Sequence, residues 1–390
     1  MKKPSLAILV SAAIAVSGLS SATQAVDLSF NVEEARILKA QQTMPEVTAR
    51  YAGLVDGLAS KYQSHNDELK ITQMVASQGV RLWQQAVRDV QSGNNDDRSL
   101  YWSRLAMRAL IKQNRPGFNI VPWQKDILIK AVESASRGLS DIAFSEQAQI
   151  KILLTGFDPF FLDRNIEQSN PSGLVALALD GYRFKVNGKR VQVETAMIPV
   201  RYSDFDNGII ESMLTPIYRD NSVDMIATVS MGRDAFDLER FPGRNRSASA
   251  PDNLNHYTGA SMTLPKAPGF NGTTLKGPEF VEFSLPVAAM QAVKGEWAVN
   301  DNRTITTLSR GEFDASSLGE LDSAISVQGS GGGYLSNEIS YRSVLLQQQF
   351  NSRIPVGHIH TPRVKGFDPE VEAKIVDQVK AMLMAAAQTL

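Results

Sequence analysis

Three side chains that lie far apart in the chain are of types that could do hydrolytic chemistry: the hydroxyl of Ser336, the imidazole of His360 and the carboxylate of Glu239. Ser336 follows three glycines and the pair Tyr334 and Leu335, and glycines let the backbone turn sharply and approach a substrate closely. A serine in this position can present its hydroxyl at a helix N-terminus, where backbone N–H groups can also hold an oxyanion. The competing interpretation of Ser336 is an ordinary helix N-cap.

Two of the four histidines, His358 and His360, alternate with a single residue between them. In a strand both would point to the same face. Such a pair could be metal ligands, which would require further His or carboxylate ligands, or one of them could be the general base for a nucleophile. His65 and His256 show no ligand spacing, which disfavours the metal site. A structural, hydrogen-bonded role stays open for His358.

The carboxylate candidate, Glu239, follows the apolar run at residues 223–229. A carboxylate in a hydrolytic site can orient an imidazole and stabilise the imidazolium that forms during the reaction. The competing interpretation is a surface ion pair with Arg240 or Arg233, a common arrangement that contributes little to stability.

Composition restricts the class of protein. The chain has 390 residues, 43% hydrophobic and 21% charged, and a formal net charge of -1, which is typical of a soluble globular protein of about two domains or one large domain. The balance of charge gives no reason to expect a nucleic acid as partner. The absence of cysteine excludes disulfides and thiolate metal sites. We expect no metal and no cofactor; a homo-oligomer is compatible with the sequence.

The first 25 residues have the pattern of a cleavable secretory signal. Lys2 and Lys3 precede an apolar run at residues 6–16, and small residues stand around Ala25 at the cleavage position. The run is too short to be a good membrane span, although an uncleaved anchor is the alternative. We therefore expect a periplasmic or secreted protein that has no membrane contact after cleavage.

The remaining chain divides into two parts. Residues 26–148 have apolar residues at helical spacing, best seen at 71–90, and predict a helical region that packs on the main domain. Residues 149–390 have strand-like runs at 150–154, 191–200 and 223–229, with helix-like segments between them. This alternation predicts an α/β sheet that is covered on its faces.

Later segments have weaker patterns. Residues 252–276 are loop-like, 285–293 look helical, and 300–321 are polar and rich in turns without a clear period. The last segment, 369–390, alternates charged and apolar residues and predicts an amphipathic closing helix.

Four segments together resemble the pyroglutamyl peptidase I family, and they occur in that family's order. The resemblance covers roughly residues 151–364, more than half of the chain. The matching segments are 154–160 (LTGFDPF) followed by 170–172 (NPS), then 238–240 (LER), 333–337 (GYLSN) and 358–362 (HIHTP), with weaker similarity at 251–253 (PDN) and 284–287 (SLPV).

The resemblance implies a role for each matching residue. It places Phe157 and Phe160 in the walls of a pyroglutamate pocket, although two such aromatics after a strand would otherwise be assigned to the core. It places Glu239, Ser336 and His360 on the family's catalytic glutamate, nucleophile and histidine. It also implies a three-layer α/β/α sandwich around a twisted mixed sheet, and removal of a pyroglutamyl residue from the blocked N-terminus of a peptide.

The chain departs from the family in three respects. The family nucleophile is Cys, whereas a serine hydroxyl at position 336 is not ionised near neutrality as a thiol partly is. Residues 241–244 (FPGR) differ from the family's run, and 300–321 have the character of an insertion. The helical region has no counterpart in the compact family enzyme.

Two classes of function follow from these observations. The first is a hydrolase in which His360 takes the proton of Ser336 while Glu239 holds the imidazole. The second is a non-catalytic binding or scaffold protein that keeps the peptidase fold. The geometry of the three side chains distinguishes the two.

Overall fold

The computed structural model describes residues 30–390, so the predicted signal sequence lies outside the described residues. Helices come first, and strands begin only at residue 150. The helices of this first part are α1 (Val32–Ala35), α2 (Ile37–Thr43), α3 (Pro45–Ala49), α4 (Ala52–Ser64), α5 (Ile71–Gln91), α6 (Arg98–Gln113) and α7 (Pro122–Ala135).

The second part is built on a seven-stranded mixed sheet in the order β2-β3-β1-β4-β12-β5-β8. β3, β1, β4 and β12 run parallel, β2 is antiparallel to β3, and β5 is antiparallel to β12. Its strands are β1 (Ile150–Phe157), β2 (Arg183–Val186), β3 (Lys189–Ile198), β4 (Met225–Met231), β5 (Phe236–Glu239), β8 (Val299–Asn302) and β12 (Val356–Thr361).

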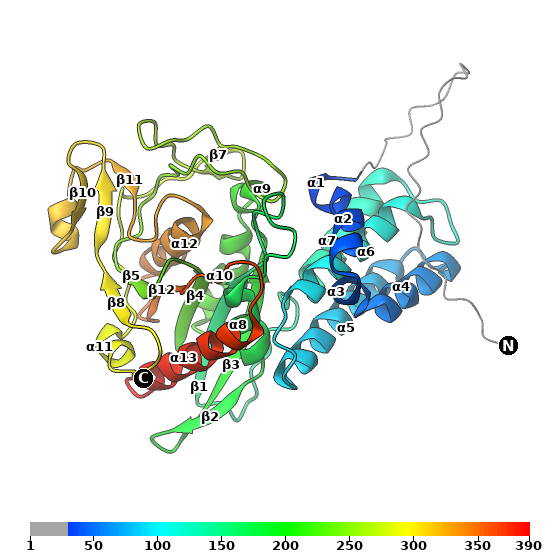
Figure 1. Ribbon diagram of the computed structural model, residues 1–390, viewed down its shortest axis with the longest axis horizontal. Helices are drawn as coiled ribbons and strands as arrows, with labels where there is room; N and C mark the ends of the chain where they lie inside the picture. Colours follow the sequence, from blue (N-terminus) through cyan, green and yellow to red (C-terminus); the bar gives the residue numbers. More distant parts are fainter. Residues whose placement is uncertain (1–29) are drawn as a thin grey trace.

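Helices cover both faces of this sheet (Figure 1). One layer contains α8 (Pro171–Leu179), α11 (Val287–Gln291) and α13 (Pro369–Ala387), and the other contains α10 (Ile209–Asp220) and α12 (Leu335–Gln349). The central strands are buried along nearly their whole length, as expected for a sheet that is covered on both faces. The predicted α/β/α sandwich with a mixed sheet and an N-terminal helical extension is confirmed.

One segment without a strand pattern in its sequence folds into strands. Residues 300–321 lack a clear period, yet they contain the end of β8, then β9 (Thr304–Thr307) and β10 (Gly311–Asp314), which pair with β11 (Ser326–Gln328) in a three-stranded sheet. These strands are only three or four residues long and largely polar, so no alternation of apolar residues marks them. A further short ribbon, β6 (Gly269–Phe270) with β7 (Thr273–Thr274), lies in the segment predicted as loop.

The helical part and the sheet part share a core. Leu174 and Leu177 of α8 and Met197 of β3 pack into the apolar cluster of the helical part, beside Trp83 of α5. Ion pairs also join side chains of the two parts.

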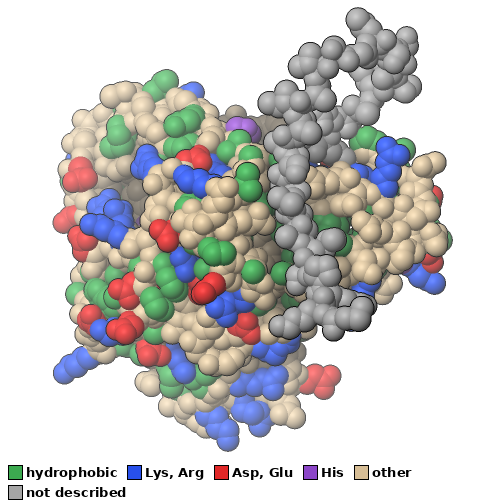
Figure 2. Space-filling model, turned by 45° about the vertical axis from the view of Figure 1, so that its right-hand side comes forward, with side chains coloured by type: hydrophobic (Ala, Val, Ile, Leu, Met, Phe, Trp, Pro, Cys, Tyr) green, Lys and Arg blue, Asp and Glu red, His purple; other side chains and the backbone are tan. Residues whose placement is uncertain are grey.

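Between residues 30 and 390, no helix is both long and apolar enough to cross a membrane. On the face shown in Figure 2, cationic and anionic side chains are interspersed.

One completely buried charged contact between the two parts is centred on Asp158, which follows β1. Arg104 of α6 donates from Nη1 to Asp158 Oδ1 at 2.8 Å, and Arg137 donates from Nη1 to Oδ2 at 2.6 Å. Both side chains of the Arg104 pair are almost completely buried, 0% and 1% exposed. Removing one member of such a buried pair leaves an uncompensated charge.

Replacing Arg104 with methionine should therefore destabilise the protein by about 3 kcal/mol, the lower end of what breaking a buried ion pair costs. The measurement is urea unfolding followed by circular dichroism. Arg219→Met is the control, because Arg219 pairs with its neighbour Asp220 on the surface, and its midpoint should match the wild type. Equal midpoints for all three proteins would show that the Arg104 pair does not hold the two parts together.

Candidate active site

The centre of the candidate site is a hydrogen bond between Glu239 and His360, which lie 121 residues apart in the chain. β5 and β12 are adjacent antiparallel strands, and this pairing brings Glu239 Oε1 to 2.5 Å from His360 Nδ1. Glu239 is 1% exposed and His360 is 8% exposed. Burial raises the pKa of Glu239, and the charge and hydrogen bond of His360 oppose that rise.

This contact defines the state of the imidazole. A carboxylate can only accept, so Nδ1 of His360 carries the hydrogen and donates it to Glu239. In the neutral form of this imidazole, Nε2 keeps its lone pair and can act as a base. The predicted alternative for Glu239, a surface ion pair, is wrong: Arg240 instead pairs with Asp301 and Glu282.

The second oxygen of Glu239 is held by Asn302, a residue that sequence reasoning missed. Asn302 Nδ2 donates to Glu239 Oε2 at 2.8 Å and to the carbonyl oxygen of Ser330 at 3.0 Å. Asn302 ends β8, inside the segment that looked like an insertion. A polar residue in a polar, turn-rich segment gave no signal that could have identified it.

The glycine-rich turn that precedes Ser336 is clamped to the end of β5. Ser330 and Phe241 exchange two hydrogen bonds of 3.0 Å, one through the Ser330 amide and one through its hydroxyl. A Cβ atom at Gly329 would collide with Asn337 Oδ1, and one at Gly333 would collide with Ser247 Oγ. At Gly329 a Cβ atom would also collide with the backbone nitrogen of Gly243, so close approach of two backbone segments requires glycine there.

Ser336 is the second residue of α12. The helix N-cap is Tyr334, which makes no side-chain cap, so the interpretation of Ser336 as the N-cap is wrong. The Ser336 hydroxyl donates to the carbonyl oxygen of Gly331 at 3.2 Å and is partly exposed. The N–H groups of the first helical turn have no acceptor within the helix, which makes this position suited to negative charge.

A small pocket connects Ser336 to the predicted aromatic residues. Phe157 and Phe160 line it together with Ser336 and Ser230, and its volume is about 40 Å³. Ser230 on β4 is the register partner of His360 on β12, so the imidazole is one strand away from a residue that lines the pocket. In the described structure, residues 30–390, no hydrogen bond joins the side chains of Ser336 and His360.

His358 has a different environment from His360. It is completely buried, with Nδ1 2.8 Å from Thr228 Oγ1 and Nε2 2.7 Å from Ser230 Oγ. Burial, and then the charge of His360, hold the pKa of His358 well below its usual range. His358 is therefore a neutral, structural histidine. Within residues 30–390, no three His, Asp or Glu side chains are placed to hold a metal ion.

Solved structures of pyrrolidone carboxyl peptidase from Pyrococcus furiosus are similar to part of the chain. One, a point mutant, shares 20% identity and a TM-score of 0.41, and covers 62% of this chain and 100% of that one. Another, described together with a cysteine-free mutant, shares 19% identity and a TM-score of 0.42, and covers 62% and 99%. The assignment of fold rests on the chain's own sheet and helices.

A relative matches more of the chain than these structures do, and so do two family models taken together. Uncharacterized protein PA0049 of Pseudomonas aeruginosa is 29% identical over 396 aligned positions, which cover 78% of this chain and 72% of the relative. The model of the PA0049 N-terminal domain matches residues 13–133. The model of the PA0049 C-terminal domain matches residues 151–318 and 313–365, more than half of the 390 residues, and the chain therefore belongs to the PA0049 family.

Proposed function

We propose that this protein is a hydrolase that removes a pyroglutamyl residue from the N-terminus of peptides, with Ser336 as nucleophile, His360 as general base and Glu239 as the carboxylate that orients it. The observation that carries the proposal is the buried 2.5 Å contact between Glu239 and His360. A carboxylate buried against a histidine near the carboxyl ends of β4 and β12 is suited to general-base chemistry.

In the proposed reaction, Nε2 of His360 takes the proton from the Ser336 hydroxyl as Oγ attacks the acyl carbon of the pyroglutamyl group. The bond between this carbon and the leaving nitrogen then breaks, and His360 returns the proton to the leaving amine. Water next attacks the acyl-enzyme, again with His360 as base, and releases pyroglutamate and free Ser336. Glu239 stays ionised throughout and stabilises the imidazolium.

The oxyanion would lie at the start of α12. The attacking oxygen and the unpaired N–H groups of the first turn belong to the same turn of helix, so the developing negative charge forms beside donors that need no rearrangement. Before attack, the Ser336 hydroxyl must rotate away from the Gly331 carbonyl, which it contacts at 3.2 Å, toward the imidazole.

Phe157 and Phe160 support the proposed specificity, because their rings offer apolar walls to a flat, uncharged lactam. Phe157 is fixed by a stacked contact with Phe205 at 6.4 Å between ring centroids. The pocket of about 40 Å³ is much smaller than typical ligand pockets of roughly 300–1,000 Å³. Binding therefore requires Phe160, which is partly exposed, to move outward.

The second candidate function is peptide binding without turnover. The contact between the Ser336 hydroxyl and the Gly331 carbonyl favours it, because this contact leaves the hydroxyl unconnected to His360. In that case a peptide end would enter the same pocket and no acyl-enzyme would form.

Hydrolysis of pyroglutamyl p-nitroanilide by the mature chain separates the two functions. We expect wild-type turnover, and a loss of about 10³-fold or more in Ser336→Ala, because removing the nucleophile of a triad removes most of its rate enhancement. Ser336→Cys should be faster than wild type if the site is shaped for a thiolate. Ser340→Ala is the matched control, since Ser340 is buried on the same helix and its hydroxyl has no hydrogen-bond partner among residues 30–390. Equal rates for wild type and Ser336→Ala would exclude the serine mechanism, and inactivity of both wild type and Ser336→Cys would favour the binding protein.

Replacing Glu239 with glutamine tests the role of the carboxylate in the same assay. The amide keeps the shape but can donate to Nδ1, which favours the wrong tautomer, so kcat should fall by up to about 10⁴-fold, as in other triads. Glu282→Gln, at a partly exposed partner of Arg240, should keep the wild-type rate. An unchanged kcat in Glu239→Gln would contradict the proposed orientation of His360.

We also propose that the protein is exported to the periplasm or beyond, on the basis of the signal-like residues 1–25. Mass spectrometry of the protein recovered from a periplasmic extract should then give Val26 as the first residue. Recovery of the uncleaved chain in the cytosolic fraction would contradict export.

A further inference from the structure

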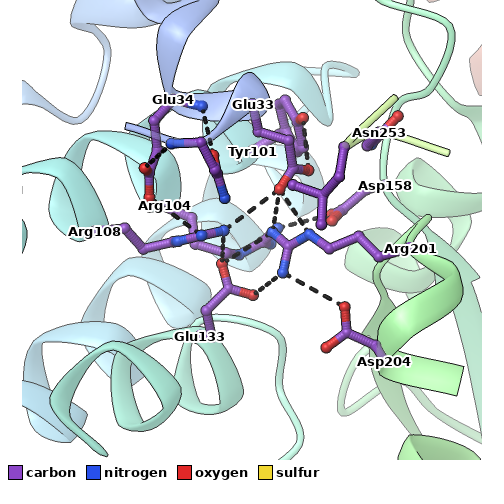
Figure 3. Close-up of polar contacts among 12 residues, drawn as sticks. Glu33, Glu34, Tyr101, Arg104, Arg108, Glu133, Asp158, Arg201, Asp204 and Asn253 are labelled. Carbon is purple, nitrogen blue, oxygen red and sulfur yellow. Dashed lines mark hydrogen bonds and ion pairs between the residues drawn. The ribbon is translucent and has the colours of Figure 1, made fainter. Parts of the chain in front are cut away.

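A second cavity lies between the helical part and the sheet part, formed by residues that the proposed hydrolytic site does not use. Its volume is about 720 Å³, within the size range of small-molecule sites. One side comes from α7 and the link that follows it, and the other comes from the segment after β3, α9 (Tyr202–Asp206) and α10. Four of its charged side chains are drawn in Figure 3: Arg108, Glu133, Arg201 and Asp204.

One part of the cavity is apolar. The side chains of this part come from the link between α7 and β1 and from one face of α10, and they are Leu139, Ile142, Phe144, Ile209, Met213 and Ile217. Ile129 of α7 adds to the lining near the charged groups. A hydrocarbon chain would find a continuous apolar surface here.

The other part of the cavity is cationic. Arg108, Lys130, Arg137 and Arg201 line it, against two carboxylates, Glu133 and Asp204.

Most of these charges already have partners. Arg201 contacts Glu133 at 3.1 Å, and Arg108 contacts Glu133 at 2.8 Å. Both arginines also contact Glu33, which does not line the cavity (Figure 3). Burial opposes ionisation of Glu133, but the guanidinium groups of Arg201 and Arg137 outweigh it and hold the pKa of Glu133 well below its usual range.

Three donors of the lining stay unpaired among residues 30–390, and one of them is Nε of Arg108. Arg137 uses Nε for Glu133 and Nη1 for Asp158, while its Nη2 atom is buried and has no acceptor among residues 30–390. The Arg137 side chain is only 2% exposed. Lys130, on the same side, is exposed and has no ion-pair partner in the described part of the chain. A buried guanidinium nitrogen without an acceptor is unfavourable, and an anion that reached it would remove that penalty.

We propose that this cavity binds an organic monoanion with an apolar body, a carboxylate on a hydrocarbon chain, with the carboxylate at Arg137 and Lys130 and the chain along α10. A planar carboxylate accepts from a guanidinium edge with good geometry. The site is independent of Ser336, and it gives the helical part a function: α7 and the link after it supply one half of a ligand site whose other half is α10.

Isothermal titration calorimetry on the mature chain tests the proposal with octanoate as the probe, octanol as the apolar analogue without charge, and acetate as the charge without the chain. Octanoate should bind at least about tenfold more tightly than either, a difference measured directly as a ratio of Kd values. Octanol binding as tight as octanoate would overturn the anionic part of the proposal, and the absence of any octanoate binding would overturn it altogether.

Two neighbouring isoleucines of α7 give a matched test of location. Ile129 lines the cavity, whereas Ile127 is 45% exposed and does not. Ile129→Trp should fill the cavity and weaken octanoate binding by about tenfold or more, while Ile127→Trp should leave Kd within about twofold. Equal effects of the two variants would contradict the assigned location.

Lys130→Gln and Arg137→Gln test the charge. Each should reduce the preference for octanoate over octanol, and Lys130 is exposed, so that its variant should fold even if Arg137→Gln does not. An unchanged preference in Lys130→Gln, with Arg137→Gln either unchanged or unfolded, would reject the cationic end. The titrations measure binding alone, so their outcome is separate from that of the hydrolysis assay.

Discussion

The two parts of the molecule depend on one buried carboxylate, Asp158. It lies within the segment that supplies Phe157 and Phe160, directly after β1. A carboxylate that is 1% exposed must be neutralised to be tolerated, and both guanidiniums that neutralise it, Arg104 and Arg137, come from the helical part or its link. The loop that forms the aromatic pocket is therefore held by residues outside the sheet. The helical part then acts as a second support for the pocket loop.

In the candidate active site, too, a buried carboxylate is held by partners from separate segments of the chain. Glu239 is buried, and each of its oxygens has a partner: His360 for one and Asn302 for the other. Asn302 also holds the Ser330 carbonyl, at the start of the turn that leads to Ser336. One carboxylate thus connects the orientation of the imidazole to the position of the glycine-rich turn. Because β8, which ends at Asn302, pairs with β5, the edge of the main sheet contributes to the site.

The sequence predicted those parts of the structure in which residue pattern and environment agree. Long apolar runs identified β1, β3 and β4, and helical spacing identified α5, because burial of these faces is what stabilises them. The resemblance of four segments, in the order of a known family, also predicted that Glu239 and His360 belong to one site. Sequence reasoning missed β8 to β10 and Asn302, since short polar strands have no hydrophobic period. It missed Glu33 and Arg201 as well, because a charged residue is ordinarily expected on the surface, and only the fold shows that they neutralise each other in the interior.

In the proposed mechanism, a serine hydroxyl stands where the resemblance implies a thiol, and this makes the geometry around Ser336 decisive. A thiolate can persist at a helix N-terminus without a hydrogen bond to the base, because the positive end of the helix lowers its pKa. A hydroxyl has no such stable ionised form near neutral pH, so it must lose its proton during the attack itself. The proposed mechanism therefore requires direct contact between the Ser336 hydroxyl and Nε2 of His360 at that moment. In the described structure the Ser336 hydroxyl contacts the Gly331 carbonyl instead, and rotation about its Cα–Cβ bond is the step that would convert the resting arrangement into a reactive one. A substrate that fills the space between Phe157 and Phe160 would approach the same hydroxyl, so binding and activation are expected to occur together.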